Sequence, residues 1–296
     1  MNTNNRLLLS AVAFATVAIW GTTFVWTKLL ILNGLSPAQI FTIRFVIAYV
    51  LMCAFSLVRD RHHRWVSDTP SDELVMAMLG LTGGSLYFLA ENEALRFTTA
   101  TNTSLIVCSC PLFAALVIGM FYKSERYSRT QTAGTLLALA GMAVVVMNGH
   151  FVLHLSPLGD ALAFGACFSW AVYSLLMKRV MGRYSSMFIT RKVFFYGIVT
   201  ILPYYILEPG WPPLDMLMQP DVATNLLFLG SVASMACYLM WSWCMKGLGA
   251  VSCTNFVYFN PLTTIAAAWL ILDEQVTMFF LLGSLLIISG MYLLNR

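Results

Sequence analysis

The stretch SLIVCSCPLFAALVIGMFYKSER, residues 104–126, decides the fold. It carries no charge as far as Tyr122 and then ends in Lys123, Glu125 and Arg126. A helix that crosses the hydrocarbon core of a bilayer needs about 20 mainly apolar residues, and its ends lie among polar groups. The stretch is therefore typical of a membrane-spanning helix that ends in a charged loop.

The composition places the rest of the chain in the same class. Of the 296 residues, 59% are hydrophobic and 10% are charged, whereas a soluble domain carries about 25% charged residues. This excludes a water-soluble protein. The formal net charge of +4 comes from basic residues scattered between apolar runs, not gathered in a stripe, so it does not indicate a nucleic-acid partner. We expect the chain to lie in the lipid bilayer.

Ten apolar runs have the length of a membrane span. They predict an all-α membrane protein with ten transmembrane helices near residues 7–28, 38–58, 74–95, 99–122, 130–147, 157–177, 186–207, 222–245, 250–272 and 276–294. The first run resembles a signal sequence, but it is long and no small-residue cleavage pattern follows it. We therefore expect it to remain as the first helix.

The loop charges predict the orientation, because cytoplasmic loops of membrane proteins are enriched in Lys and Arg. If the N-terminus is cytoplasmic, that face carries twelve basic residues and the other face carries two, Lys28 and Arg96. The twelve are Arg6, Arg59, Arg61, Arg64, Lys123, Arg126, Arg129, Lys178, Arg179, Arg183, Lys246 and Arg296. Both termini are predicted to be cytoplasmic, in a bacterial inner membrane.

The opening stretch has a second copy. Shifted by 150 positions, Pro111-Leu112 falls on Pro261-Leu262 within TNFVYFNPLTTIAAAWLILDEQ, residues 254–275. The same shift pairs Trp20 with Trp170 and Lys28 with Lys178, and a shift of 149 pairs Gly141-Met142 with Gly290-Met291. Chance hydrophobic similarity would not keep these residue types in phase. The chain is therefore predicted to be a tandem repeat, residues 1–148 and 149–296.

The two copies are expected to be inverted. Each holds five spans, so the second must enter the membrane from the opposite side. The loops agree, because Lys123-Ser-Glu-Arg126 in the first copy corresponds to Asp273-Glu-Gln275 in the second. Two inverted halves can exchange conformations and open a central site to either side in turn. The alternative is a duplication that only enlarges the bundle.

The repeated motifs resemble the EamA-type transporters of the drug/metabolite transporter superfamily. The residues that carry the resemblance are Ile19-Trp20-Gly21, Ala94-Leu95, Thr98 to Asn102, Pro111, Glu125 and Gly134 to Gly141, each followed by its repeat. The resemblance covers nearly the whole chain. It implies two inverted five-helix bundles, a cavity lined mainly by spans 1 to 4 and 6 to 9, and secondary transport, often export, of small metabolites. The second copy departs from the pattern with Ala171 in place of Gly21.

Charges inside the spans are the first candidates for a substrate site, because a charge in the bilayer usually faces a partner or a wet cavity. Arg44 lies about 10 Å into the second span at 1.5 Å per residue, and Glu91 and Glu93 approach the same outer side on the third span. Arg44 and Glu91 are predicted to form an external gate or substrate site. The alternative is a static ion pair, or side chains that reach the headgroups.

The equivalent place in the second half reads differently. Arg191 and Lys192 lie near the Arg44 repeat position, but Trp241 and Trp243 replace the two glutamates. Cations without carboxylate partners favour an anionic or zwitterionic solute, and only one of them need face the cavity. The alternative is that both reach the inner membrane surface.

Aromatic and amide side chains complete the predicted cavity, because binding pockets are mostly apolar with a few placed polar groups. The candidates for substrate binding beside Arg44 and Glu91 are Trp20, Tyr87, Trp170, Trp241, Tyr258, Asn102 and Asn260, with Tyr238 as a further aromatic. Core packing is the alternative for the aromatic residues. The two asparagines have a similar alternative, a hydrogen bond to a neighbouring helix.

Proline and glycine suggest how the spans move and pack. Pro111 and Pro261 interrupt spans 4 and 9, where the loss of one backbone hydrogen bond permits a kink, so both are candidate gating residues or rigid bends. Gly134, Ala138 and Gly141 recur on one helical face and are partly repeated in span 10. Small residues allow close helix contacts, so spans 5 and 10 are expected to form a scaffold or a homodimer surface.

No enzyme motif accompanies these features. The four histidines fall in loops, and G-x-S-x-G, H-E-x-x-H and Walker motifs are absent, so we expect no catalytic residue, no metal site and no cofactor. His150 and His154 have helical metal spacing but lie in a short loop. The seven cysteines lie in apolar runs and are interpreted as packing residues.

The sequence therefore predicts a secondary transporter that exports small polar or amphipathic metabolites, amino-acid-like or otherwise anionic or zwitterionic, by alternating access. A polyspecific drug or uptake carrier and a non-transporting membrane scaffold are the alternatives. Protons are a candidate second partner besides the solute. Glu91 is the proposed proton-responsive group, because burial and a nearby Arg44 act on its protonation in opposite directions.

Overall fold

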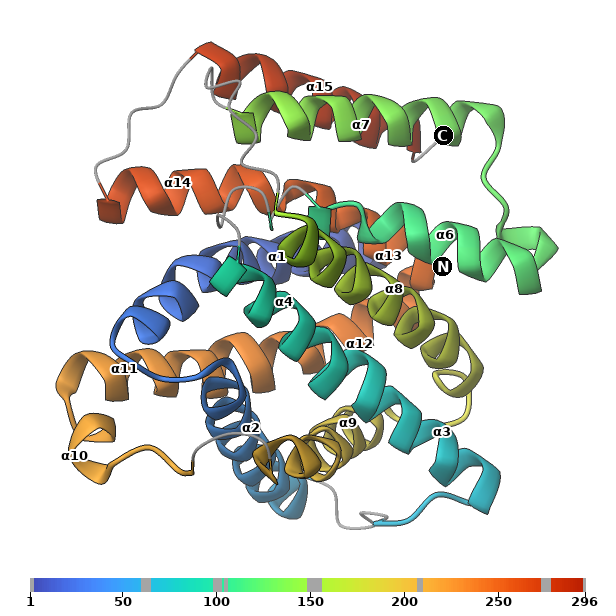
Figure 1. The fold of residues 1–296 in the computed structure, drawn as a ribbon. Coiled ribbons are helices and arrows are strands. Elements are labelled where there is room, and N and C mark those ends of the chain that lie inside the picture. Colours follow the sequence, from blue (N-terminus) through green and yellow to red (C-terminus); the bar gives the residue numbers. More distant parts are fainter. Residues whose placement is uncertain are drawn as a thin grey trace.

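Helices make up all the regular structure that is described. The computed structural model describes residues 3–59, 65–97, 103, 106–147, 156–206, 210–272 and 278–294, and within these ranges no strand occurs (Figure 1). The first half contains α1 (Thr3–Leu32), α2 (Pro37–Arg59), α3 (Pro70–Gly80), η1 (Leu81–Ser85), α4 (Leu86–Phe97), α6 (Cys110–Phe121), η2 (Lys123–Glu125) and α7 (Arg129–Met147). The prediction of an all-α chain is confirmed.

The second half follows a similar order, with two additional short helical segments between its second and third long helices. It contains α8 (Pro157–Val180), α9 (Ser186–Ile201), η3 (Leu202–Ile206), α10 (Leu214–Leu217), α11 (Pro220–Phe228), η4 (Leu229–Ala236), α12 (Cys237–Leu248), α13 (Ala250–Thr254), η5 (Asn255–Phe259), α14 (Asn260–Leu272) and α15 (Met278–Leu294). Proline is the first residue of α2, α3, α8 and α11. Its missing N–H costs nothing in the first turn, and its fixed φ favours helix initiation there.

Six helical stretches among the described residues are long and apolar enough to cross a membrane. They are Asn5–Leu32, Pro37–Val58, Pro70–Phe97, Pro157–Val180, Ser186–Tyr205 and Pro220–Leu248, and shorter apolar helices cover Cys110–Phe121 and Leu281–Leu294. These six correspond to the first three predicted spans of each half. The predicted fourth span, 99–122, lies partly outside the described residues, so the total of ten remains a prediction.

Two of the long stretches contain a wide turn at equivalent places in the repeat. Pro70 and Pro220, which occupy the same position in their respective halves, each begin a helix that passes through a π-helical segment, η1 or η4, before continuing as α4 or α12. Within η1, Gly84 leaves helical geometry altogether (φ −116°, ψ −105°). A π turn breaks the regular i→i−4 bonding, so backbone carbonyls become available to other partners. Both turns lie near the middle of their stretches.

The two halves interlock. The helix α3 packs on α9 so closely that a Cβ on Gly80 would lie 2.4 Å from the Cβ of Tyr196. A Cβ on Gly230, the repeat equivalent of Gly80, would lie 2.7 Å from the Cβ of Ile47 on α2. Each half thus presses its third helix against the second helix of the other half. In Figure 1, α3 and α9 lie at the same end of the bundle. A central space between the interlocked helices is therefore lined by both halves.

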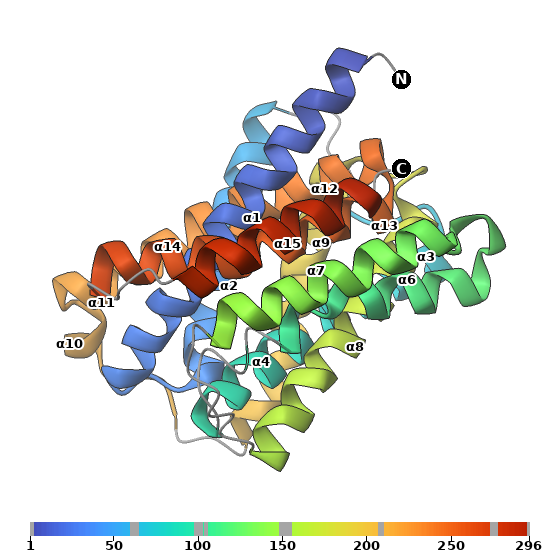
Figure 2. The ribbon, with the colours of Figure 1, turned by 90° about the horizontal axis from the view of Figure 1, so that it is seen from above.

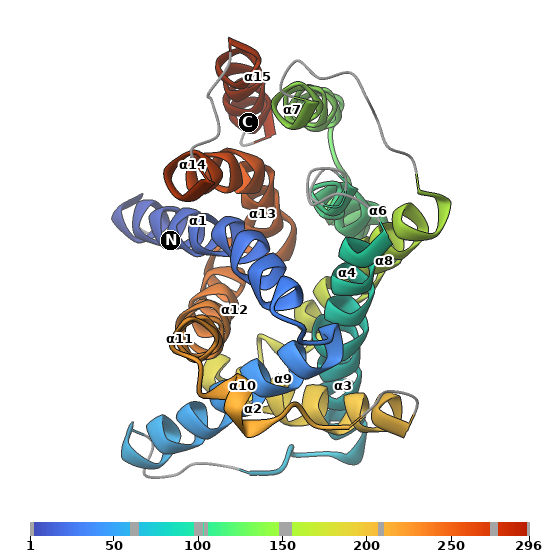
Figure 3. The same cartoon turned by 60° about the vertical axis from the view of Figure 1, so that its left-hand side comes forward.

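The last helices of the two halves form a separate layer. Figure 1 and Figure 2 show α7 beside α15, and Figure 3 shows this pair end-on at one edge of the bundle. A Cβ on Gly134 would lie 2.7 Å from the Gly290 carbonyl oxygen, and one on Gly141 would lie 2.7 Å from that of Gly283. The small-residue faces expected to serve as a scaffold or dimer surface therefore pack on each other within one chain. A homodimer would have to use other surfaces.

The prolines of spans 4 and 9 stand near the beginnings of α6 and α14. Pro111 is the second residue of α6, and Pro261 is the second residue of α14, which follows the tight 3-10 turns of η5. Pro111 therefore stands in the first turn of α6, where a proline takes away no intrahelical hydrogen bond. Pro261 lies where the 3-10 turns of η5 pass without a break into α14.

Candidate functional site

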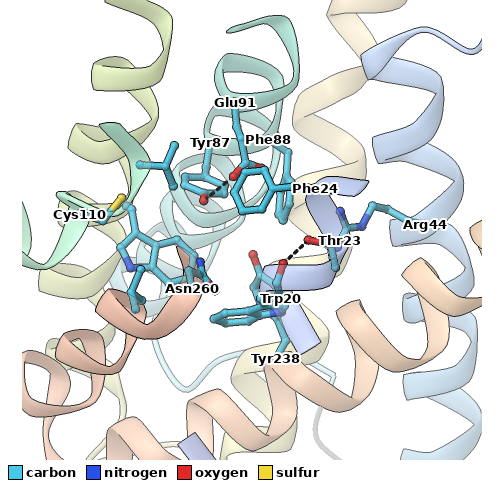
Figure 4. Close-up of a pocket in the computed structure, with 13 residues that line it drawn as sticks. Trp20, Thr23, Phe24, Arg44, Tyr87, Phe88, Glu91, Cys110, Tyr238 and Asn260 are labelled. Atoms are coloured by element: carbon cyan, nitrogen blue, oxygen red, sulfur yellow. Dashed lines mark hydrogen bonds between the residues drawn. The ribbon is translucent and has the colours of Figure 1, made fainter. Parts of the chain in front are cut away.

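A small cavity lies between the two halves, and Figure 4 shows the side chains around it. Its walls are formed by Trp20, Thr23, Phe24, Arg44, Tyr87, Phe88, Glu91, Val107, Cys110, Trp170, Tyr238, Val257 and Asn260. The free volume is about 40 Å³, which is room for one or two water molecules. Sites for small molecules usually measure about 300 Å³ or more. A metabolite would therefore need the surrounding helices to move apart.

Aromatic rings from both halves form most of the wall. Trp20 of α1 and Trp170 of α8, equivalent in the repeat, meet edge to face with ring centroids 5.9 Å apart. Tyr238 lies 5.8 Å from Trp20, and Tyr87 lies 5.1 Å from Trp170. Such contacts hold the rings in specific orientations and present apolar faces to the interior. The cavity is thus suited to a solute with an apolar body.

Two opposite charges line the same cavity without touching. The Arg44 side chain is buried, its Nε donates a hydrogen bond to Ser234 Oγ (2.9 Å), and its guanidinium lies 4.5 Å from the centre of the Phe88 ring. Glu91, also buried, accepts a hydrogen bond at Oε1 from the Tyr87 hydroxyl (2.9 Å), one helical turn away. The predicted ion pair between Arg44 and Glu91 is absent, although the two charges are close enough to attract each other.

Some polar atoms of the wall have no partner in the part of the chain that the structure describes. They are the indole Nε1 of Trp170 and the amide Oδ1 of Asn260. A buried polar group without a hydrogen bond costs about 1–3 kcal/mol, so a donor and an acceptor kept unpaired at a cavity are available to a solute or to water. The sequence predicts that Asn260 binds either a solute or a neighbouring helix, and in the structure it lines the cavity with its Oδ1 unpaired among the described residues.

Three of the predicted site residues do not line the cavity or cannot be placed. Trp241 lies behind the wall, with its ring centroid 5.0 Å from that of Trp20. Tyr258 is buried in a different cluster, beneath the α7–α15 layer, together with Ala138 and Ile287, and it does not line this cavity. Asn102 lies outside the described residues.

The two cations of α9 have partners, contrary to prediction. Lys192 forms an ion pair with Glu73 at the start of α3, and the Tyr196 hydroxyl donates to the same carboxylate. Arg191 donates a hydrogen bond to Ser56 (2.6 Å) and stacks over the Trp65 ring (4.4 Å). Neither side chain lines the cavity. Sequence reasoning misses these partners because they come from the other half of the chain, which interlocks with α9.

Sequence reasoning also overlooks part of the cavity wall. Thr23 and Phe24 follow Trp20 by three and four residues, so they share its face of α1, and this spacing is the signal that identifies them. Phe88 and Cys110 have no comparable signal. Within the described ranges, no three His, Cys, Asp or Glu side chains gather closely enough to hold a metal ion.

A family model described as the EamA-like transporter family matches residues 8–147 and again residues 157–296. The chain belongs to this family. It is an integral membrane transporter rather than an enzyme, and the double match confirms the predicted repeat. The sequence resemblance to the EamA-type transporters is thereby confirmed as well.

Full-length relatives carry transporter names. An uncharacterized transporter of Archaeoglobus fulgidus is 28% identical over 99% of this chain and 98% of its own length. A probable amino-acid metabolite efflux pump of Escherichia coli is 25% identical over 95% and 92% of the two chains. A probable terminal-alkyne amino-acid exporter of Streptantibioticus cattleyicolor is 26% identical over 95% and 91%. All three relatives are named as transporters, pumps or exporters, and each matches nearly the whole length of this chain.

One solved crystal structure shares the fold. It superposes with a TM-score of 0.76 at 19% sequence identity and covers 97% of this chain and 97% of its own. Because the overlap is nearly complete in both chains, the interlocked arrangement of the two halves belongs to a fold that has been solved before.

Proposed function

We propose that this protein exports small zwitterionic metabolites, amino-acid-like and with an apolar side chain, by alternating access. The observation that carries the proposal is the placement of Arg44 and Glu91 in one aromatic cavity, both buried and not paired with each other. Burying an unpaired charge costs several kcal/mol. A zwitterion offers a carboxylate to Arg44 and an ammonium group to Glu91, and once the surrounding helices move apart its apolar body would lie against the rings of Trp20 and Trp170.

The printed names of relatives agree with this solute class. The relative in Escherichia coli is named a probable amino-acid metabolite efflux pump, and the one in Streptantibioticus cattleyicolor is named a probable terminal-alkyne amino-acid exporter. Both names combine export with an amino-acid solute. For this chain they favour export of zwitterions over a polyspecific drug or uptake carrier, because a drug carrier would not need charges of both signs in its cavity.

We place the protein in a bacterial inner membrane with ten spans and both termini in the cytoplasm. The support is the excess of basic residues on the predicted inner face. Reporter fusions to the loops and to both ends test this arrangement, and a C-terminus found outside the cell would overturn it. A cysteine placed at His62 should react with an impermeant reagent from the cytoplasmic side.

Transport in sealed vesicles tests the solute class with three matched compounds. Leucine carries both charged groups, isoamylamine lacks the carboxylate, and 2-hydroxyisocaproate lacks the ammonium group. We expect leucine to move at least tenfold faster than either analogue, since each lost charge leaves one buried group unpaired. In Arg44→Gln, this preference over isoamylamine should disappear. Equal movement of all three compounds would overturn the zwitterion proposal, and unchanged fluxes for every solute tested would favour a scaffold.

Proton coupling is a second part of the proposal. Glu91 is a buried carboxylate on the cavity wall, with a hydrogen bond from Tyr87 and no ion pair to a described cation. In a conformation that separates it further from Arg44, Glu91 could take up a proton, and solute export would then be linked to proton entry. If no such linkage exists, facilitated diffusion is the simpler account.

A further inference from the structure

Trp20 and Trp170 occupy equivalent positions in the repeat but differ in their hydrogen bonds. The indole Nε1 of Trp20 donates to the backbone carbonyl of Ala233 at 2.9 Å. The indole Nε1 of Trp170 is buried and has no partner among the described residues. The two equivalent tryptophans therefore line one cavity, but only the indole N–H of Trp20 has a hydrogen-bond partner among the described residues.

The carbonyl that Trp20 uses has its own counterpart. Ala233 lies in the π turn η4, and Gly83, its equivalent in the first half, lies in the π turn η1. The side chain of Ser169, next to Trp170, donates to the Thr82 carbonyl at 2.7 Å, so α8 runs directly beside η1. The repeat equivalent of the bond from Trp20 to Ala233 is thus a bond from Trp170 to Gly83, between segments that are already neighbours.

The Gly83 carbonyl can receive that bond. In this conformation it accepts a hydrogen bond from the Tyr238 hydroxyl at 2.6 Å, and a carbonyl oxygen has two lone pairs. The equivalent of Tyr238 in the first half is Phe88, which has no hydroxyl. The two halves therefore hold their π turns with different side chains in this conformation, as expected when inverted repeats adopt unlike shapes.

We propose that the two indoles are alternating latches. The bond from Trp20 to Ala233 holds the present conformation, and a bond from Trp170 to Gly83 holds the conformation that faces the other side of the membrane. The inference rests on the proposed alternating access, in which each half takes the shape of the other. Each conformation then has one indole bond to a π turn, so neither is favoured by this group alone. Because the two rings are in edge-to-face contact, a movement of one ring displaces the other.

The test removes each N–H without changing the shape of the ring. Trp20 or Trp170 is replaced by benzothienylalanine, in which sulfur stands in place of the N–H group. Cys110 lines the cavity and serves as the reporter, with the other six cysteines replaced by alanine. In sealed vesicles without solute, the rate at which a membrane-impermeant thiol reagent modifies Cys110 is measured from each side.

The ratio of the two rates reports which way the cavity faces. We expect the replacement at Trp20 to shift this ratio away from the present conformation and the replacement at Trp170 to shift it in the opposite direction, each by roughly three- to tenfold, as for one neutral hydrogen bond. The same replacement at Trp26, which packs on Phe228 outside the cavity, should leave the ratio unchanged. Because a ratio is measured, partial loss of folded protein does not imitate the result.

The outcomes separate the inference from the function it rests on. If Cys110 reacts from both sides but the two replacements shift the ratio in the same direction, or the one at Trp170 has no effect, the latch is wrong and alternating access stands. If Cys110 reacts from one side only in every variant, alternating access itself fails, and the latch fails with it.

Discussion

Lys192 on α9 pairs with Glu73 at the start of α3, although the two residues stand 119 positions apart and belong to opposite halves of the chain. The Lys192 side chain is 8% exposed and that of Glu73 is 23% exposed. Close by, Asp72 accepts hydrogen bonds from Arg183 and from Tyr184. The first turn of α3 is therefore fixed to the second half by two carboxylates in a row.

Removing one partner of this pair should destabilise the protein. We expect Lys192→Gln to lower the free energy of unfolding by about 2 kcal/mol, between the values for exposed and fully buried pairs. Glu73→Gln should cost a similar amount, and the double variant should cost less than the sum of the two. Thermal unfolding in detergent measures the effect. Arg179→Gln, an exposed change at the same end of the molecule, is the control, and additive losses would contradict the pair.

Glu91→Gln keeps the shape of the cavity and removes a titrating group. We expect this variant to lose solute accumulation driven by a proton gradient, while downhill exchange continues with a raised KM for solutes that carry an ammonium group. Vesicle transport with and without an imposed pH gradient measures both. Glu93→Gln is the matched control, because Glu93 is bonded to Arg96 and Tyr204 away from the cavity. A wild-type pH dependence in Glu91→Gln would rule out this residue as the coupling site.

A single methyl group added within the α7–α15 contact should lower the stability of the protein. A Cβ on Gly290 would lie 2.5 Å from the Gly134 carbonyl oxygen, so we expect Gly290→Ala to destabilise the fold by about 1–3 kcal/mol. The control is Gly165→Ala, because Gly165 lies on α8 with nothing within 4 Å of its added Cβ. Alanine favours a helix over glycine by about 1 kcal/mol, so the control should be neutral or stabilising. Equal melting temperatures for the two variants would contradict this contact.

Alkaline pH should weaken one link between the halves. Tyr127, in the loop between α6 and α7, donates a hydrogen bond to Asn255 Oδ1 (2.6 Å), and burial raises its pKa to about 12. The unfolded chain releases this proton near pH 10. The stability that Tyr127 contributes is therefore full below about pH 10 and is lost as the pH rises toward 12.

The Tyr127→Phe variant isolates this contribution. We expect its melting temperature to lie below that of the unaltered protein at pH 8, and the difference between them to shrink by pH 11.5. Tyr292→Phe, an exposed change on α15, provides the control for general alkaline effects. A difference that is the same at both pH values would show that the titration of Tyr127 does not contribute to the loss of stability at alkaline pH.

The features that local chemistry controls are predictable from the sequence. The length of an apolar run limits where a helix can cross a bilayer, and a proline such as Pro70 or Pro220 marks where it begins. A constant shift between the two halves identifies the repeat, and the same shift relates the two π turns. Trp20 and Trp170 can be singled out because both copies keep a large aromatic residue in mid-span.

The direction in which each side chain points could not be predicted. In a membrane helix, lipid and protein neighbours are both apolar, so the pattern along the chain does not tell the buried face from the outer one. Tyr258 is a predicted cavity residue but packs beneath the α7–α15 layer. The partner of Lys192 escapes prediction for a related reason, since only the interlocking of the halves brings Glu73 near it.

The π turn η1 also sets the direction, around the helix axis, in which the side chains of α4 point. A regular α-helix advances by about 100° per residue, so a chain that lacked one residue of Leu81–Ser85 and closed into a regular helix would present α4 rotated by roughly that angle. Tyr87 and Glu91 would then leave the cavity, while the apolar length of the span would hardly change. Insertions and deletions in this segment are thus a route by which related proteins can exchange one set of cavity side chains for another without altering how the chain inserts into the membrane.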